Sequence, residues 1–305
     1  MSRTIPSCST TLPGTQPVLT HHQVTQAAAP SHRFRGRIGA DLAGGFYPAP
    51  HRYHIHVSRG CPLSLRVSIT LDLLGLEDSV TTTVITPPAA TPGALAPLRS
   101  AYEATRHHYT GPLTMPALCD RWSGRIVSNH TPDILRDLAD HLSGHDTDVR
   151  HRLRPPALAA QIDDLGELLD ERVTEAAQRA GAAPAPHRQG EALETLLTAL
   201  ALIERRLASQ PYALGGELTA ADVDLWVTLV HLDAVHRLHL DADAVHTIAE
   251  YDRLWAYVRR LHAHSAFHGA FHADHMARSH RSTCRGPQSS GAAIPLPGVL
   301  ANATA

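Results

Sequence analysis

Apolar and polar residues alternate over Tyr53–Val57, and apolar residues then recur at helical spacing from residue 63 to residue 74. The first pattern is typical of a half-buried strand, and the second is typical of an amphipathic helix. Cys61 lies between them and is followed by Pro62, a residue that is tolerated at the first position of a helix. The sequence therefore predicts a strand, a short turn and a helix that begins beside Cys61.

A pair of strands is predicted further along the chain. Pro116 precedes the apolar run 117–120, and a short turn leads to another apolar segment at residues 125–128. This arrangement is typical of a hairpin whose first strand opens with proline. Thr131 then has the character of a helix N-cap and is followed by proline and aspartate, so we expect a helix that runs to about His141.

From residue 158 onward the pattern is that of helices alone. Leucine and isoleucine recur at helical spacing, and the predicted helices cover residues 158–180, 191–207, 220–236 and 249–262. Thr219, with Asp222 three residues later, forms the pattern of a capping box at the start of the third helix. Trp226 and Trp255 are expected in the core rather than in a binding site.

Composition limits the classes of function. A chain of 305 residues with 43% apolar residues has the size of two domains. The net charge is −2. The chain contains no lysine, and its arginines form no arginine-rich block, so a nucleic acid is not an expected partner. No segment reaches the length of a membrane span, and the four widely spaced cysteines match neither a disulfide framework nor a zinc site. We expect a cytoplasmic protein with reduced thiols and no membrane partner.

The position of Cys61 carries the strongest chemical signal. Unpaired N–H groups and the positive end of the helix dipole favour an anion at a helix start, so we expect the pKa of this thiol to be lowered. The motif is Cys61-Pro62-Leu63-Ser64, and Ser64 cannot resolve a mixed disulfide as a second cysteine would. A separate small thiol must then regenerate the cysteine, which indicates a thiol-dependent reductase or transferase.

Over residues 33–299 the chain resembles the glutathionyl-hydroquinone reductases, also called xi-class glutathione transferases. The matching segments are Arg33-Phe34-Arg35, Gly44-Gly45-Phe46, Arg52-Tyr53-His54, Cys61-Pro62, Gly75-Leu76-Glu77-Asp78, Tyr109-Thr110-Gly111, Thr114-Met115-Pro116, Ile126-Val127-Ser128-Asn129, Leu232-Asp233-Ala234-Val235, Asp274-His275 and Ile294-Pro295-Leu296. The resemblance implies an α/β thioredoxin-like N-terminal domain plus an all-α glutathione-transferase-like C-terminal domain. It also implies a homodimer.

The predicted domains follow from these patterns. We expect a disordered tail at 1–32, a thioredoxin-like domain with an N-terminal extension at 33–142 and a linker at 143–157. An all-helical domain at 158–283 and a C-terminal tail at 284–305 complete the chain.

The resemblance also implies the site. Cys61 is the expected nucleophile, and Pro116 is expected to be cis and to face it. The predicted thiol-binding residues are Leu63, Met115, Pro116, Asn129, His130 and Thr131. The expected cofactor is glutathione or another low-molecular-weight thiol, and the expected partner is a small-molecule thiol conjugate. His236 and His280 are candidates for the acceptor site, because they stand where the family has tyrosines and histidine can donate or shuttle a proton.

The chain also departs from the family pattern. Leu63 replaces a tryptophan, His130 replaces a glutamate that would meet the ammonium group of glutathione, and Pro112 replaces a basic residue. These changes indicate altered thiol or acceptor specificity. Two alternatives stay open: an enzyme of this type that uses another thiol such as mycothiol, and a non-catalytic binding module of the same fold.

A histidine-rich segment near the end of the chain requires separate treatment. His264, His268, His272 and His275 would share one face of a continuous helix and could then bind zinc or nickel. No cysteine or carboxylate cluster completes such a site, and Gly269 weakens the helix. We therefore expect no metal and interpret the segment as a solvated helix that partly faces a pocket.

Overall fold

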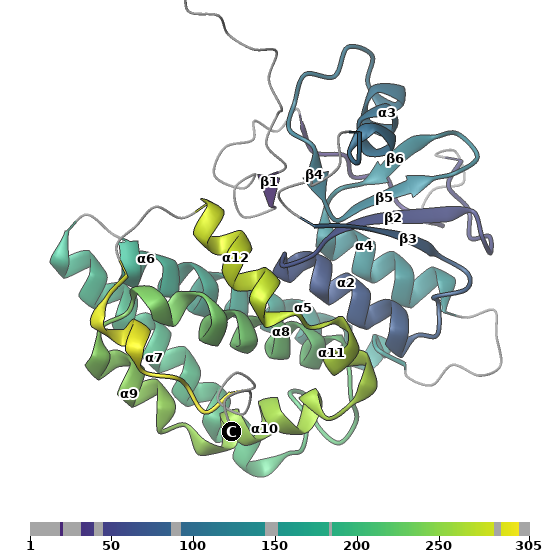
Figure 1. The fold of residues 1–305 in the computed structure, drawn as a ribbon. Coiled ribbons are helices and arrows are strands. Elements are labelled where there is room, and N and C mark those ends of the chain that lie inside the picture. Colours follow the sequence, from purple (N-terminus) through teal and green to yellow (C-terminus); the bar gives the residue numbers. More distant parts are fainter. Residues whose placement is uncertain are drawn as a thin grey trace, which may run out of the picture.

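The computed structural model describes residues 19–20, 32–39, 45–86, 93–143, 152–182, 185–283 and 288–298. Figure 1 shows a small sheet with helices on both faces, packed against a larger group of helices formed by the second half of the chain. The fold is therefore a thioredoxin-like α/β domain followed by an all-α domain, as the sequence predicts. Most of the predicted tail 1–32 lies outside the described residues.

The main sheet has four strands in the order β3-β2-β5-β6. These strands are β2 (Tyr53–Ser58), β3 (Thr81–Ile85), β5 (Ala117–Asp120) and β6 (Arg125–Ser128). Strand β2 runs parallel to β3 and antiparallel to β5, and β5 pairs with β6 as an antiparallel hairpin. The predicted strand and hairpin are confirmed, whereas β3 was not predicted. A separate pair joins β1 (Leu19–Thr20) in parallel to β4 (Thr114–Met115).

Three helices cover this sheet. Figure 1 shows α3 (Ala96–Thr105) on the face away from the helical domain, and α2 (Pro62–Leu73) and α4 (Thr131–Asp137) on the face toward it. Helix α2 begins beside Cys61, as predicted. The N-cap of α4 is His130, so the prediction of Thr131 as the cap is wrong by one residue. Helix α4 continues as a π-helical turn, η3 (Leu138–Leu142), which ends close to the predicted His141.

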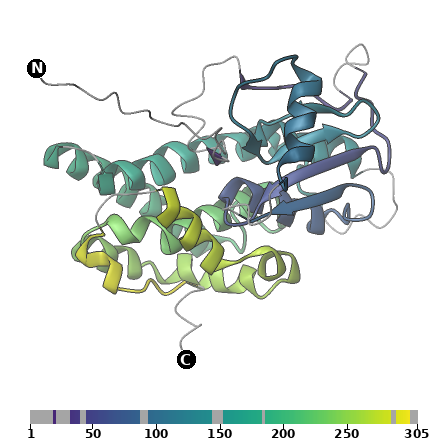
Figure 2. The same ribbon diagram turned by 45° about the horizontal axis from the view of Figure 1, so that its top comes forward.

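The second half of the described chain is helical throughout. Its elements are η4 (Pro156–Leu158), α5 (Ala159–Leu168), η5 (Leu169–Glu175), α6 (Ala176–Ala182), α7 (Pro186–Ser209), α8 (Ala220–Ala234), η6 (His236–His239), α9 (Ala242–Ala249), α10 (Asp252–His262), α11 (Ser265–Ala270), α12 (Ala273–Thr283) and η7 (Ser290–Ala293). The four predicted helices are present, and α9 was not predicted. Figure 2 shows the same helices lying together on one side of the sheet domain.

Helix α8 is the centre of the helical domain. It is buried on almost every side, and Trp226 within it is fully buried, as is Trp255 of α10. Both indole N–H groups are satisfied: Trp226 donates to the carbonyl of Val258 at 3.0 Å, and Trp255 donates to that of Ile248 at 2.9 Å. The two tryptophans are therefore core residues, as predicted.

The end of the chain packs onto the same domain. Leu296 is fully buried, and Arg237 donates hydrogen bonds to the carbonyls of Ala292 and Ile294, each at 3.0 Å. The described part of the predicted tail is thus ordered by contacts to η6. Among the described helices, none combines the length and apolarity that crossing a bilayer requires.

The predicted capping box at the start of α8 is present and buried. Asp222 accepts hydrogen bonds from the backbone N–H of Thr219 at 2.8 Å and from that of Ala213 at 2.7 Å. It also accepts one from the Tyr257 hydroxyl at 2.8 Å. This carboxylate therefore joins the start of the central helix to a loop and to α10.

Replacing this carboxylate should destabilise the helical domain. The substitution Asp222→Ala leaves three buried donors without an acceptor, so we expect a loss of about 2–4 kcal/mol in the free energy of unfolding. Urea denaturation followed by circular dichroism measures it. Asp243→Ala, which removes an exposed carboxylate from the first turn of α9, is the matched control and should change stability by less than about 0.5 kcal/mol. Equal effects of the two substitutions would contradict the assigned role.

Candidate active site around Cys61

Cys61 occupies the N-cap position of α2. Its backbone is extended (φ −92°, ψ 123°), and Pro62 follows inside the first turn, where its missing N–H costs no helical hydrogen bond. The backbone N–H of Cys61 donates to the carbonyl of Ser58 at 3.2 Å, and its carbonyl accepts the first helical bond from Leu65 at 3.0 Å. The thiol is therefore fixed at the positive end of a 12-residue helix.

The loop before β5 lies against this thiol. The Met115–Pro116 peptide bond is cis, as predicted, and the Cys61 thiol donates to the carbonyl of Met115 at 3.9 Å. Both Cys61 and Met115 are almost fully buried, at 1% exposure each. The structure therefore brings together the nucleophile and the proline loop, which lie 54 residues apart in the sequence.

The polar residues after Cys61 hold its helix in place. Ser64 is buried, and its hydroxyl accepts a hydrogen bond from the backbone N–H of Ser58 at 2.9 Å. Arg66 reaches into the helical domain, where it donates to Thr228 at 3.1 Å and pairs with Asp224 at 3.3 Å. Burial opposes the charge of Arg66, but the nearby carboxylates keep the pKa of its guanidinium above the usual value. The fourth motif residue, Ser64, is thus structural.

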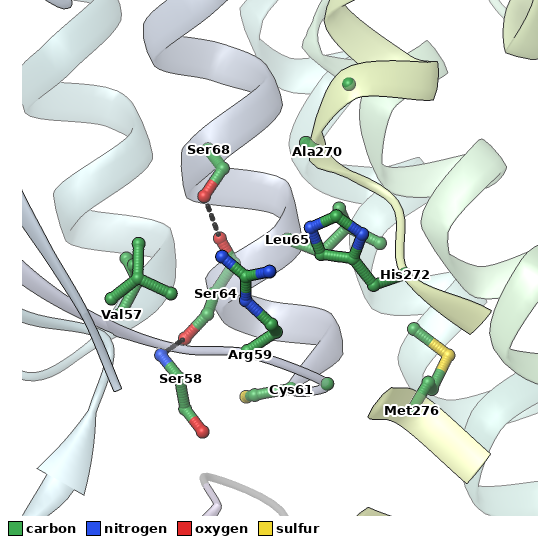
Figure 3. A pocket seen from close by; sticks show the side chains of 13 residues that line it. Val57, Ser58, Arg59, Cys61, Ser64, Leu65, Ser68, Ala270, His272 and Met276 are labelled. Carbon is green, nitrogen blue, oxygen red and sulfur yellow. Dashed lines mark hydrogen bonds between the residues drawn. The ribbon is translucent and has the colours of Figure 1, made fainter. Parts of the chain in front are cut away.

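Cys61 also lines a cavity of about 160 Å³ (Figure 3). Its lining comes from β2, β3, the start of α2 and the α11–α12 segment: Val57, Ser58, Arg59, Gly60, Cys61, Ser64, Leu65, Ser68, Val84, Gly269, Ala270, His272 and Met276. A cavity of this volume accommodates one six-membered ring. The C-terminal helices therefore form part of the wall beside the nucleophile.

The α12 backbone approaches the cysteine turn closely at Gly60. This residue has a positive φ of 88°, and a Cβ atom there would lie 2.6 Å from the carbonyl oxygen of His275. Glycine is required here for two reasons. Other residues rarely adopt this positive φ, and a side chain would clash with the backbone of α12. The sequence alone gave no sign of this contact.

The other predicted thiol-site residues do not line the cavity. Leu63 is half-buried in the first turn of α2. Asn129 is buried, and its side chain is fully engaged: it donates to Thr114 at 3.0 Å and to the carbonyl of His32 at 3.1 Å, and accepts from the N–H of Phe34 at 2.8 Å. These contacts favour a positioning role for Asn129, and its predicted role in binding stays untested.

The start of α4 combines a histidine, a threonine and a buried carboxylate. His130 pairs with Asp133 at 3.1 Å, and Asp133 also binds Arg35 at 2.7 Å. The pKa of His130 is lowered overall, because the effect of burial outweighs the opposing effect of the nearby Asp133 carboxylate. Thr131 is 1% exposed, and its hydroxyl has no hydrogen-bond partner within the described part of the chain. Burial opposes the charge of Asp133, but Arg35 and His130 keep the pKa of this carboxyl below its usual value.

The two acceptor-site candidates do not line the cavity. His236 is buried in η6, with its ring 4.6 Å from that of His231. His280 has its Nε2 atom 2.7 Å from Nε2 of His239, and burial lowers its pKa to about 4. The cavity instead contains His272, which the sequence analysis assigned to a pocket-facing helix, and Arg59, which it did not single out.

The histidine-rich segment is not one helix. Helix α11 ends at Ala270 and α12 begins at Ala273, so His264 and His268 lie on a different helix axis from His275. Among the residues that the structure describes, no group of three or more His, Cys, Asp or Glu side chains is arranged to hold a metal ion.

Cys119 provides an internal comparison for Cys61. It lies in the middle of β5, is 6% exposed, and has its Sγ atom 3.9 Å from the carbonyl of Ala117. Burial, aided by the neighbouring Asp120, raises the pKa of the Cys119 thiol to about 12. Cys8 and Cys284 lie outside the described residues.

Known proteins resemble this chain in sequence and in fold. Residues 155–260 match the family model of the glutathione S-transferase C-terminal domain. The chain is 31% identical over 270 residues to the glutathionyl-hydroquinone reductase YqjG of Escherichia coli, covering 81% of each protein. The glutathione-bound structure of YqjG superposes with a TM-score of 0.70 at 28% identity, covering 81% of this chain and 87% of that one.

Two further solved structures have the same fold. A glutathione transferase from Gordonia bronchialis superposes with a TM-score of 0.74 at 28% identity, covering 83% of each chain. A xi-class glutathione transferase from Natrialba magadii gives 0.70 at 27% identity, covering 84% of this chain and 85% of that one.

The contrast between the two described thiols leads to a test. At neutral pH, Cys61 should be alkylated faster than any other cysteine, because a helix start favours the thiolate. Cys119 should stay unlabelled, since its thiol is protonated and buried. Iodoacetamide labelling across a pH series, quantified by peptide mass mapping, measures all four rates. Equal labelling of the four cysteines at pH 7 would contradict the assignment.

Proposed function

The chain belongs to the glutathionyl-hydroquinone reductases, the xi class of glutathione transferases, and we propose that it reduces aromatic thioethers of a small thiol through Cys61. One observation carries the proposal. Cys61 contacts the Met115 carbonyl of the cis-proline loop through its sulfur and also lines a cavity of about 160 Å³. A thiol conjugate placed across Cys61 would have its peptide part against the loop and its ring in the cavity.

The proposed reaction has two steps. The Cys61 thiolate attacks the sulfur of the conjugate, so a Cys61–thiol disulfide forms and the bond between that sulfur and the ring carbon breaks. The ring carbon keeps the electron pair and takes a proton, which gives the free hydroquinone. A second small thiol then attacks the mixed disulfide, releases the symmetrical disulfide and returns Cys61 to its thiolate. The second thiol is the reductant, and the ring carbon is reduced.

The chain's own residues supply the positions for these steps. In this proposal the backbone of Met115, next to Pro116, binds the peptide part of the thiol. The buried Thr131 hydroxyl, which has no partner among the described residues, supports assigning the start of α4 to the carboxylate end of the thiol. Asn129 holds the loop by its bonds to Thr114 and to the N-terminal segment.

Glutathione is the first candidate for the small thiol. YqjG has been solved with glutathione bound. Mycothiol remains the alternative, because His130 and Leu63 replace residues that the family uses around glutathione. Incubating the reduced protein with glutathione disulfide and, separately, with mycothiol disulfide, then recording intact masses, identifies the thiol that forms an adduct. A non-catalytic binding module would form neither adduct.

Removing the Cys61 sulfur should abolish turnover without unfolding the protein. Serine is nearly isosteric with cysteine but cannot exchange with a disulfide, so Cys61→Ser should lower the reduction rate by at least about 1,000-fold. The measurement is hydroquinone release from a glutathionyl-hydroquinone in the presence of glutathione, with circular dichroism to check the fold.

Cys119→Ala is the control for this variant. It removes the other described thiol, which is buried and protonated, and should keep activity within about threefold if the fold is retained. Turnover that survives in Cys61→Ser would assign catalysis to another residue and reject the mechanism.

The residues that depart from the family pattern should weaken glutathione binding. A missing charge-assisted hydrogen bond at position 130 costs about 1.5–3 kcal/mol, or roughly ten- to a hundred-fold in affinity. The substitution His130→Glu, combined with Leu63→Trp, should therefore tighten glutathione binding by about that factor, as measured by titration calorimetry. Arg35 lies beside Asp133 and would also offset the added negative charge.

Each single substitution is measured beside the double one, because neighbouring sites can couple. His246→Glu, an exposed position on α9, introduces the same charge far from α4 and should leave affinity unchanged. Tight binding of glutathione by the unaltered protein, with no effect of either substitution, would show that these departures do not change thiol choice.

A further inference from the structure

Arg59 places a positive charge inside the cavity beside the nucleophile. It lines the cavity two residues before Cys61, and Figure 3 shows its guanidinium reaching toward Ser64 and His272. Within the described part of the chain Arg59 forms no salt bridge, and its Nε atom is buried without a hydrogen-bond partner. The Arg59 side chain is half-buried, so an anion bound against its unpaired Nε–H would gain a charge-assisted hydrogen bond in a partly desolvated site.

A second buried donor faces the same space. Ser58 lines the cavity and is only 4% exposed, and its hydroxyl has no partner among the described residues. His272 also lines the cavity, and burial together with the positive Arg59 lowers its pKa. A neutral imidazole that keeps one N–H is a hydrogen-bond donor. The polar part of the cavity therefore offers donors from β2, the cysteine turn and the α11–α12 segment.

The remaining wall suits an aromatic ring. Val57, Leu65, Val84 and Met276 are apolar, and the cavity has the volume of a single six-membered ring. None of the proline-loop or α4 residues assigned to thiol binding lines it. Cys61 belongs to both regions, since its sulfur contacts the Met115 carbonyl and the residue also lines the cavity. The ring partner of the thiol, rather than the thiol itself, fits this space.

We propose that the preferred acceptor is a single-ring hydroquinone thioether that carries an acidic substituent, bound by Arg59 and Ser58 in the cavity beside Cys61. The expected effect on turnover rests on the proposed function, whereas the anion site itself does not. The inference deepens that function by naming the substrate class. The geometry assigns the carboxylate, or an equivalent anionic group, to the Arg59 end and the ring to the apolar walls.

The catalytic test compares two probes that differ by one carboxylate. These are the glutathionyl thioether of 1,4-dihydroxybenzene and that of 2,5-dihydroxybenzoate. The measured quantity is the ratio of kcat/KM for the carboxylated probe to kcat/KM for the plain probe. Wild-type protein should give a ratio above one, and Arg59→Leu should lower it roughly ten- to a hundred-fold, because a charge-assisted pair in a partly desolvated site is lost.

Two variants keep this comparison specific. Arg59→Lys retains the charge without the planar fork and should give an intermediate ratio. Arg179→Leu removes an exposed arginine from α6, so it matches the change in net charge and should leave the ratio unaltered. A ratio that is unchanged in Arg59→Leu, or lowered equally in Arg179→Leu, overturns the proposal.

A binding measurement separates this inference from the proposed function. The Cys61→Ser protein, which cannot turn over, is titrated with free 2,5-dihydroxybenzoate and with 1,4-dihydroxybenzene. The carboxylated ring should bind about tenfold tighter or more, and Arg59→Leu in the same background should remove the difference. If neither thioether is turned over but this preference is present, the anion site stands and the reaction fails. If both are turned over without any preference, the site fails and the reaction stands.

A carboxylate of glutathione is the other possible source of the anion. Glutathione alone is therefore titrated into wild-type protein and into Arg59→Leu. The proposal expects affinities within about twofold, because the predicted thiol site lies on the Met115 side of Cys61. A loss of glutathione affinity as large as the loss for 2,5-dihydroxybenzoate would assign Arg59 to the thiol and overturn the acceptor assignment.

Discussion

The start of helix α2 depends on contacts from parts of the chain that lie far apart in sequence. The Met115 carbonyl meets the Cys61 thiol from one side, and the backbone of α12 lies against Gly60 on the other. Arg66, one turn further along, is buried among the carboxylates and hydroxyls of the helical domain. Because a buried charge is costly once its partner is removed, Arg66 ties the position of Cys61 to the packing of the two domains.

Polar contacts also determine where the proline loop lies. Asn129 follows the last strand, yet its amide bonds to Thr114, directly before Met115, and to the segment at Phe34. Arg35 on that segment pairs with Asp133 in the first turn of α4. The N-terminal segment, the proline loop and the start of α4 therefore form one hydrogen-bonded unit. A change in any of them would move the proposed thiol site as a whole, even without contact to a bound thiol.

The sequence predicted the elements whose patterns are local. The strand 53–58, the helix after Cys61, the hairpin at 117–128 and the capping box at Asp222 each follow from spacing within a few residues. Strand β3 was missed because it is an edge strand with three threonines, so its apolar pattern is weak. The cavity was missed for a different reason: it depends on packing between residues about 200 positions apart. Comparison with the family pattern predicted His236 and His280 as acceptor-site residues. The break between α11 and α12 instead brings His272 to the cavity.

Burial alone does not distinguish the two described cysteines, since Cys61 is 1% exposed and Cys119 is 6% exposed. What differs is the charge around each sulfur. Cys119 lies within a strand beside Asp120, where burial and the negative carboxylate both disfavour a thiolate. Cys61 lies at the positive end of a helix, with the guanidinium groups of Arg59 and Arg66 on the same turn and helix. Burial alone disfavours a thiolate at either site, so the helix start and the nearby guanidinium groups are what set Cys61 apart from Cys119.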